Sequence, residues 1–121
     1  MTGVVTALDE ALIQLQLRSA QTDITREAIL DTGFNGALVI TPADAEALGF
    51  SAQYLQAYEL ADGTSKLLPV AMIDVLWSSH WRVVLAVIAG GGALIGMTLL
   101  RGMRVTLDVV DRGLVTIEDL P

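Results

Sequence analysis

A short run in the first third of the chain combines residue types that can catalyse hydrolysis. The apolar pair Ile29-Leu30 is followed at once by Asp31, Thr32 and Gly33. Gly33 has no side chain, so a substrate or a second carboxylate can approach the backbone beside Asp31. The hydroxyl of Thr32 can hydrogen-bond to backbone groups and hold the loop rigid. We therefore take Asp31 as the candidate catalytic residue, supported by Thr32 and Gly33.

Peptide hydrolysis by carboxylates uses two acids that lie close together and share one proton. The ionised acid deprotonates a water molecule, while the protonated acid polarises the carbonyl group and assists the leaving amine. The chain of 121 residues has one Asp-Thr-Gly run and no Asp-Ser-Gly run. A symmetric homodimer would supply the second acid by placing two copies of Asp31 on its two-fold axis.

Composition narrows the other kinds of chemistry. The chain has no cysteine, which excludes thiolate nucleophiles, disulfides and cysteine-ligated metals. The single histidine, His80, argues against a histidine-based metal site and against a Ser-His-Asp triad. Seven basic and fourteen acidic residues give a formal net charge of −7, which argues against a nucleic-acid partner. We expect neither a metal nor an organic cofactor, so the chemistry falls to carboxylates, hydroxyls or Lys66.

Short apolar or alternating segments separated by turn signals predict a mostly β fold. Ala11–Arg18 alternates apolar and polar residues, as a half-buried strand does. Thr41 and Pro42 begin a helix that Gly49 ends, and a second helical turn falls within 96–101. The expected strands are 11–18, 22–30, 37–40, 54–60, 66–75, 81–88, 93–95, 103–110 and 114–117. This pattern predicts an all-β barrel or sandwich with one or two short helices.

One segment resembles a membrane span. Val83–Leu100 comprises eighteen uncharged residues, and about eighteen apolar residues can cross a bilayer as a helix. The run 90–92 is three glycines, and each glycine costs a helix about 1 kcal/mol relative to alanine. We expect two buried strands joined by a glycine turn, with a membrane anchor as the alternative. The first ten residues lack the basic residues of a secretory signal, so we expect a cytoplasmic protein.

Two motifs in order make the sequence similar to a known family. Asp31-Thr32-Gly33 after an apolar pair matches the active-site signature of aspartic proteases, and Leu94-Ile95-Gly96 matches their second signature. The spacing suits the single-domain members, and the variant with Phe34 after the glycine resembles the retropepsin-like proteins of bacteria and archaea. The resemblance covers residues 10–118. It implies one retropepsin-like acid protease barrel over 1–121 that acts as a homodimeric aspartic endopeptidase on a peptide or protein substrate.

The resemblance also implies a role for particular residues. Asp31 would be the catalytic carboxylate, Thr32 would lock the two active-site loops together across the dimer, and Gly33 would face the substrate backbone. A flap around residues 61–64 would close over the peptide. The expected substrate-binding residues are Phe34, Asn35, Gly36, Ala61, Asp62, Gly63 and Ile95.

The chain departs from the family pattern at three positions. Family members usually carry alanine or serine where this chain has Phe34, which cannot hydrogen-bond to the carboxylate and narrows a pocket. Retroviral members pair an acid with an arginine where this chain has Asn35 and Met97, so both halves of that ion pair are replaced and no charge is orphaned. The alternative function is a catalytically inactive peptide-binding or dimerisation module on the same fold.

Overall fold

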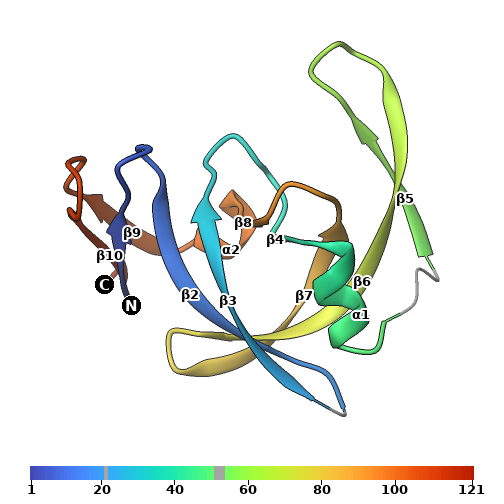
Figure 1. Ribbon diagram of the computed structural model, residues 1–121, viewed down its shortest axis with the longest axis horizontal. Coiled ribbons are helices and arrows are strands. Elements are labelled where there is room, and N and C mark those ends of the chain that lie inside the picture. The colour runs from blue at the N-terminus through green and yellow to red at the C-terminus, as the bar shows by residue number, and fades with distance from the viewer. Residues whose placement is uncertain (21, 51–53) are drawn as a thin grey trace.

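The computed structural model describes residues 1–20, 22–50 and 54–121. The strands are β1 (Thr2–Val5), β2 (Ala11–Arg18), β3 (Asp23–Leu30), β4 (Leu38–Ile40), β5 (Tyr54–Glu59), β6 (Ser65–Trp77), β7 (His80–Ile88), β8 (Ala93–Ile95), β9 (Met103–Leu107) and β10 (Leu114–Asp119), and the helices are α1 (Pro42–Ala47) and α2 (Met97–Leu100). Within these ranges the strands form one sheet in the order β5-β6-β7-β4-β8-β3-β2-β1-β10-β9. A further pairing of β2 with β6 closes the sheet on itself. The fold is an all-β barrel with short helices, as the sequence predicts (Figure 1).

The long strands follow from their alternating patterns. In β2, Ile13, Leu15 and Leu17 are buried, whereas Gln14 and Gln16 are exposed. Successive side chains of a strand point to opposite faces, so this pattern places one face of β2 in the core and the other in water. The apolar face packs with residues of β6, β7 and β10 in one continuous core.

The short central strands β4 and β8 are apolar on both faces. β8 pairs with β3 in parallel and with β4 in antiparallel orientation, and β4 pairs in parallel with β7. Leu38 and Ile95 lie in the main core, while Val39 and Leu94 pack on the opposite side with a second apolar cluster. A strand that is buried on both faces has a continuous run of apolar residues in its sequence, without alternation of apolar and polar residues.

Helix α1 begins and ends where the sequence predicts. The side chain of Thr41 accepts a hydrogen bond from the backbone N–H of Asp44, Pro42 is the first helical residue, and Gly49 has a φ of 82°. Asp44 is buried, and its carboxylate pairs with Arg26 of β3 at 2.6 Å. This ion pair ties the helix to the strand that leads to Asp31.

Several loops gather at one end of the barrel (Figure 1). The turn between β1 and β2, the loop after β3, the turn between β9 and β10 and the long β5–β6 hairpin all lie at this end. The turns between β2 and β3 and between β6 and β7 lie at the opposite end. Because β3 runs toward the first group of loops, the end that carries Asp31 is the end from which the β5–β6 hairpin projects.

The apolar segment Val83–Leu100 is not one helix. It contributes to β7, β8 and α2, and Gly91 and Gly92 have positive φ values in the turn between the two strands. The expectation of two buried strands joined by a glycine turn is therefore confirmed. Among the residues that the structure describes, no helix is both long and apolar enough to cross a membrane.

Two features of the terminal region differ from the sequence-based expectation. Strand β1 was not expected, because four residues that include Gly3 are too few to show a pattern; the strand exists because it pairs with β2 on one side and β10 on the other. Strand β9 ends at Leu107 rather than at Val110, because the chain turns at Asp108, whose carbonyl accepts a hydrogen bond from the N–H of Val110.

Truncating a core leucine tests the packing. Leu17 is fully buried in the main core, so Leu17→Ala removes buried methyl groups and leaves a cavity. We expect the free energy of unfolding to fall by about 2–5 kcal/mol in chemical denaturation followed by circular dichroism. Leu67→Ala is the control, because Leu67 is 60% exposed and its truncation should change stability little. Equal effects of the two substitutions would contradict the assigned core.

Candidate active site

Parallel pairing of β3 with β8 brings the two sequence motifs together. Ile29 pairs with Leu94 and Leu30 pairs with Ile95. The ladder extends one step beyond β3, where the backbone N–H of Asp31 donates to the carbonyl of Ile95 at 2.9 Å. The candidate catalytic residue is therefore held at the end of a strand by a backbone hydrogen bond to the second motif.

The loop after β3 folds back on the carboxylate of Asp31. The backbone N–H of Gly33 donates to Oδ1 of Asp31 at 2.9 Å, and the N–H of Phe34 donates to the Asp31 carbonyl at 3.2 Å. The bond from Gly33 orients the carboxylate, and the bond from Phe34 closes the turn of the backbone. Asp31 is half-buried, whereas Thr32 and Gly33 are exposed, so a second molecule can reach the carboxylate.

Backbone bonds from α2 fix the rest of this loop. The N–H of Met97 donates to the carbonyl of Phe34 at 2.8 Å, and the N–H of Thr98 donates to the carbonyl of Gly36 at 3.1 Å. The hydroxyl of Thr98 donates to the carbonyl of Asn35. Three successive loop residues are thus bound to the first turn of α2, and Asn35 and Met97 are neighbours without any ion pair.

Phe34 fits into this loop because two glycines make room for its ring. A Cβ atom added at Gly36 would collide with the Phe34 ring, and one added at Gly96 would collide with that ring and with the carbonyl oxygen of Gly36. The bulky side chain that departs from the family pattern is therefore matched by the absence of side chains beneath it. Phe34 also packs against the second apolar cluster, whose buried members are Val39, Val70 and Val87.

An apolar row crosses the sheet from Asp31 to the base of the β5–β6 hairpin. The row lies on the face opposite the main core, and each member pairs with the next across adjacent strands: Ile29, Leu94, Val39, Val87, Val70 and Tyr54. Phe34, Tyr58 and Leu68 pack over its centre. Burial raises the pKa of the Tyr58 phenol above its usual value. The row and the side chains that pack on it therefore form a continuous apolar layer from the residues before Asp31 to the base of the hairpin.

Ile95, which was expected to contact substrate, lies on the core side of the sheet. Ile95 is fully buried in the main core, because neighbouring residues of a strand point to opposite faces. Leu94 is the member of the second motif that faces the apolar row. Alternate residues of a strand face the same side, so Ala93 and Ile95 share one face of β8 and Leu94 occupies the other. This rule could have identified Leu94 from the sequence.

The tip expected at residues 61–64 is a tight turn at the end of the β5–β6 hairpin. The N–H of Leu60 donates to the carbonyl of Thr64, and Gly63 has a φ of 84°, which favours glycine. The carboxylate of Asp62 accepts hydrogen bonds from the hydroxyl and the backbone N–H of Thr64. Ala61, Asp62 and Gly63 are all exposed at this tip.

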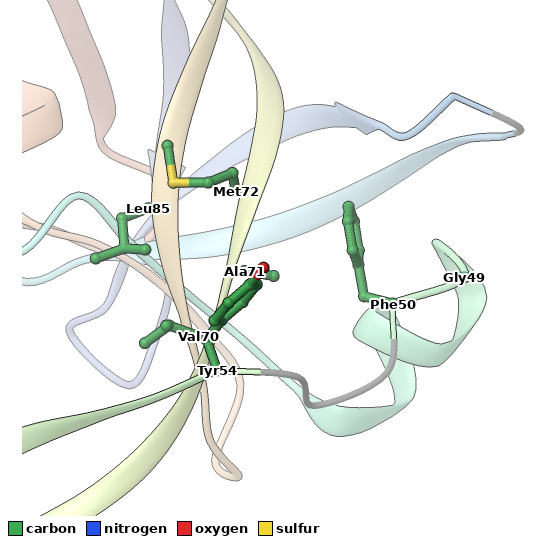
Figure 2. A pocket seen from close by; sticks show the side chains of 7 residues that line it. All are labelled: Gly49, Phe50, Tyr54, Val70, Ala71, Met72 and Leu85. Carbon is green, nitrogen blue, oxygen red and sulfur yellow. The ribbon is translucent and has the colours of Figure 1, made fainter.

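A cavity of about 440 Å³ lies at the base of the same hairpin, beside α1. Phe50, from the segment after α1, lies across from the sheet residues that line it (Figure 2). The lining residues are Gly49, Phe50, Tyr54, Val70, Ala71, Met72 and Leu85. None of these was among the residues expected to bind substrate. The signal that could have found them is that Val70 and Met72, on the outward face of β6, are both apolar.

Comparison with solved structures identifies the fold. A retropepsin-like aspartic protease from Rickettsia conorii superposes with a TM-score of 0.68 over 97% of this chain and 88% of that chain, at 17% sequence identity. The EIAV protease in complex with the inhibitor HBY-793 superposes with a TM-score of 0.52 over 76% of this chain and 86% of that chain, at 15% identity. No family profile and no curated protein sequence matches the chain.

These likenesses show the fold of the chain. The chain has the fold of the retropepsin-like aspartic proteases, and the expectation drawn from its two motifs is confirmed at the level of the fold. Its Asp-Thr-Gly loop lies beside the second motif within that fold.

The fit between Phe34 and Gly36 can be tested by a double-mutant cycle. The three atoms nearest to a methyl group at Gly36 all belong to the ring of Phe34, so we expect Gly36→Ala to lower the free energy of unfolding by about 1–3 kcal/mol. In a Phe34→Ala background, the same change should cost little, because the ring is gone. Gly90→Ala is the control, since nothing lies within 4 Å of a Cβ added there. An equal cost of Gly36→Ala in both backgrounds would show that the ring is not the obstacle.

The turn at the hairpin tip predicts a perturbed titration. Hydrogen bonds from the hydroxyl and the N–H of Thr64 hold the pKa of Asp62 below its usual value. A depressed pKa in the folded state stabilises the turn above the ordinary aspartate pKa, and this stabilisation is lost as pH falls through the lowered value. We expect NMR titration of the carboxyl carbon to show the low pKa, and Thr64→Val to raise it. Thr106→Val, on β9, should leave the titration unchanged.

Proposed function

We propose that the chain is an aspartic endopeptidase that acts as a homodimer, in which each subunit supplies one Asp31. The observation that carries this proposal is the position of Asp31. Its carboxylate accepts a hydrogen bond from the N–H of Gly33 and is accessible at the end of β3, and its backbone N–H donates to the carbonyl of Ile95 in the second motif. The fold, shared with aspartic proteases, supports the same reading.

The reaction needs one ionised and one protonated carboxyl. In the proposed cycle, the ionised Asp31 takes a proton from a bound water, and the water oxygen bonds to the carbonyl carbon of the peptide. The partner subunit's Asp31 gives its proton to the carbonyl oxygen, which yields a neutral tetrahedral diol. The C–N bond then breaks as the leaving nitrogen accepts the proton now held by Asp31. A hydroxyl of the diol gives its proton to the partner subunit's Asp31, which leaves a carboxylic acid and a free amine. The two carboxyls titrate as a coupled pair.

The surroundings of Asp31 suit an extended, partly apolar peptide. The β5–β6 hairpin can pair with the substrate backbone as an added strand does and can exclude water when it closes. Leu94 and Phe34 present apolar surface between Asp31 and this hairpin. We therefore assign substrate contacts to Phe34, Leu94 and the flap residues 61–63.

A second candidate function is peptide binding without cleavage. Phe34 favours it, because this side chain cannot hydrogen-bond to the Asp31 carboxylate as a serine could. In that case, peptide affinity would not change when Asp31 becomes asparagine.

Cleavage of a diverse peptide library from acidic to neutral pH tests the proposal. We expect the wild type to cut in the acidic to mildly acidic range, and Asp31→Asn to lose at least about 100-fold in rate, as loss of an acid–base group does. Asp23→Asn is the matched control, because Asp23 is exposed and starts β3 at the opposite end of that strand.

The outcomes separate the two candidate functions. Cleavage that survives Asp31→Asn, or a rate that is independent of pH, would exclude the proposed mechanism. Binding of peptides by wild type and Asp31→Asn with equal affinity, and no cleavage by either, would favour the binding module.

A further inference from the structure

A cleft of about 350 Å³ lies beside the turn between β6 and β7, at the end of the barrel opposite Asp31 (Figure 1). One wall is this turn with the start of β7, and the other is the segment that joins α2 to β9. The end of β10 lines it as well. Sites for small molecules have volumes of about 300–1,000 Å³, so this cleft has room for a small ligand.

The strand register places two side chains of β7 at the rim of the core. His80 pairs with Trp77, and Arg82 pairs with Val75. Side chains directly opposite each other share one face of a sheet, and both partners on β6 are buried in the main core. His80 and Arg82 therefore lie on the core side of the sheet at the point where the core meets solvent, and both are exposed.

Hydrogen bonds hold both walls of the cleft to the end of β10. The hydroxyl of Ser78 donates to the carboxylate of Asp119 at 2.8 Å, and the N–H of Leu120 donates to the carbonyl of Gly102 at 2.9 Å. Nδ1 of His80 lies 3.0 Å from the carbonyl oxygen of Ser78, which orients the ring. The two walls are thus positioned by the same short segment of chain.

Two unpaired arginines line the cleft, one on each wall. Arg82 and Arg101 form no ion pair within the part of the chain that the structure describes, although the chain has fourteen acidic residues. The acidic residue of the lining is Asp119, and its carboxylate already accepts the hydroxyl of Ser78. The two guanidinium groups therefore make the cleft a locally positive site on a protein of net negative charge.

Trp77 contributes a hydrogen-bond donor to the same cleft. Its side chain is 2% exposed, and its indole N–H has no acceptor among the described residues. A buried N–H without an acceptor destabilises a fold, so native proteins nearly always provide one. Because Trp77 lines the cleft, an acceptor bound there would lie beside its ring.

We propose that this cleft binds a phosphate group carried by a small molecule. Guanidinium groups bind phosphate oxygens in pairs of parallel hydrogen bonds, and an indole N–H can only donate. A phosphate monoester has three terminal oxygens, one for each arginine and one for the indole, whereas a carboxylate has two. The site does not use Asp31, so it stands or falls independently of the proposed protease activity.

Titration with inorganic phosphate at constant ionic strength, followed by NMR of the two indole N–H signals, tests the site. Trp77→Phe identifies the signal of Trp77 by removing it. We expect this signal to shift and to saturate, while that of Trp81, whose ring lies 4.0 Å from the guanidinium of Arg18, changes little. Glycerol phosphate should bind more tightly than inorganic phosphate, because the cleft is larger than the phosphate group alone.

Neutral substitutions of the arginines identify the ligand contacts. We expect Arg82→Gln and Arg101→Gln each to weaken phosphate binding at least about 10-fold, as the loss of hydrogen bonds to a charged group does. Arg112→Gln is the matched control, because it removes the same charge from an exposed residue in the turn between β9 and β10, at the other end of the barrel. Circular dichroism of each variant checks that the fold persists.

The outcomes decide for or against the phosphate site. A saturable shift of the Trp77 signal that both cleft variants weaken, and that Arg112→Gln and Asp31→Asn leave unchanged, would support it whether or not the chain cleaves peptides. A signal that does not move, or that moves without saturating, would overturn the site. Binding of acetate as tight as that of phosphate, or cleft variants that bind phosphate as well as Arg112→Gln does, would also overturn it.

Discussion

The parallel pairing of β3 with β8 is the constraint on which the candidate active site depends. It places Asp31 beside the second motif. It also brings the loop after β3 to the start of α2, whose backbone N–H groups bind the loop carbonyls. Because β8 is apolar on both faces, a shift of one residue would exchange Leu94 and Ile95 between the core and the opposite side. The position of the carboxylate is thus decided by the packing of its neighbours.

The bulk of Phe34 illustrates how a departure from a family pattern can be absorbed. Its ring occupies space that side chains at residues 36 and 96 would otherwise fill, and both positions are glycine. Gly96 belongs to the second motif, whereas Gly36 lies in the same loop as Phe34. The unusual residue is therefore accommodated locally, without displacing the bonds that hold Asp31.

Much of the barrel could be predicted from local sequence patterns, and the reason is physical. Alternation in β2, the cap at Thr41 and the glycine turn after β7 all depend on neighbours in sequence. The sequence does not reveal which strands lie side by side, so the apolar row that crosses six strands was not expected. Ile95 lies in the main core and Leu94 on the opposite side of the sheet, because adjacent strand residues face opposite ways. Strand β1 depends wholly on its partners β2 and β10.

The β3–β8 pairing also has a consequence for the order of folding. Leu30 and Ile95 are far apart in the chain, whereas β2–β3, β5–β6 and β6–β7 are hairpins of adjacent segments. Closing a long loop costs entropy before its contacts contribute, so local hairpins precede it. We therefore expect the candidate active site to be among the last parts of the chain to become native. Changes there should mainly accelerate unfolding, leaving the rate of folding nearly untouched.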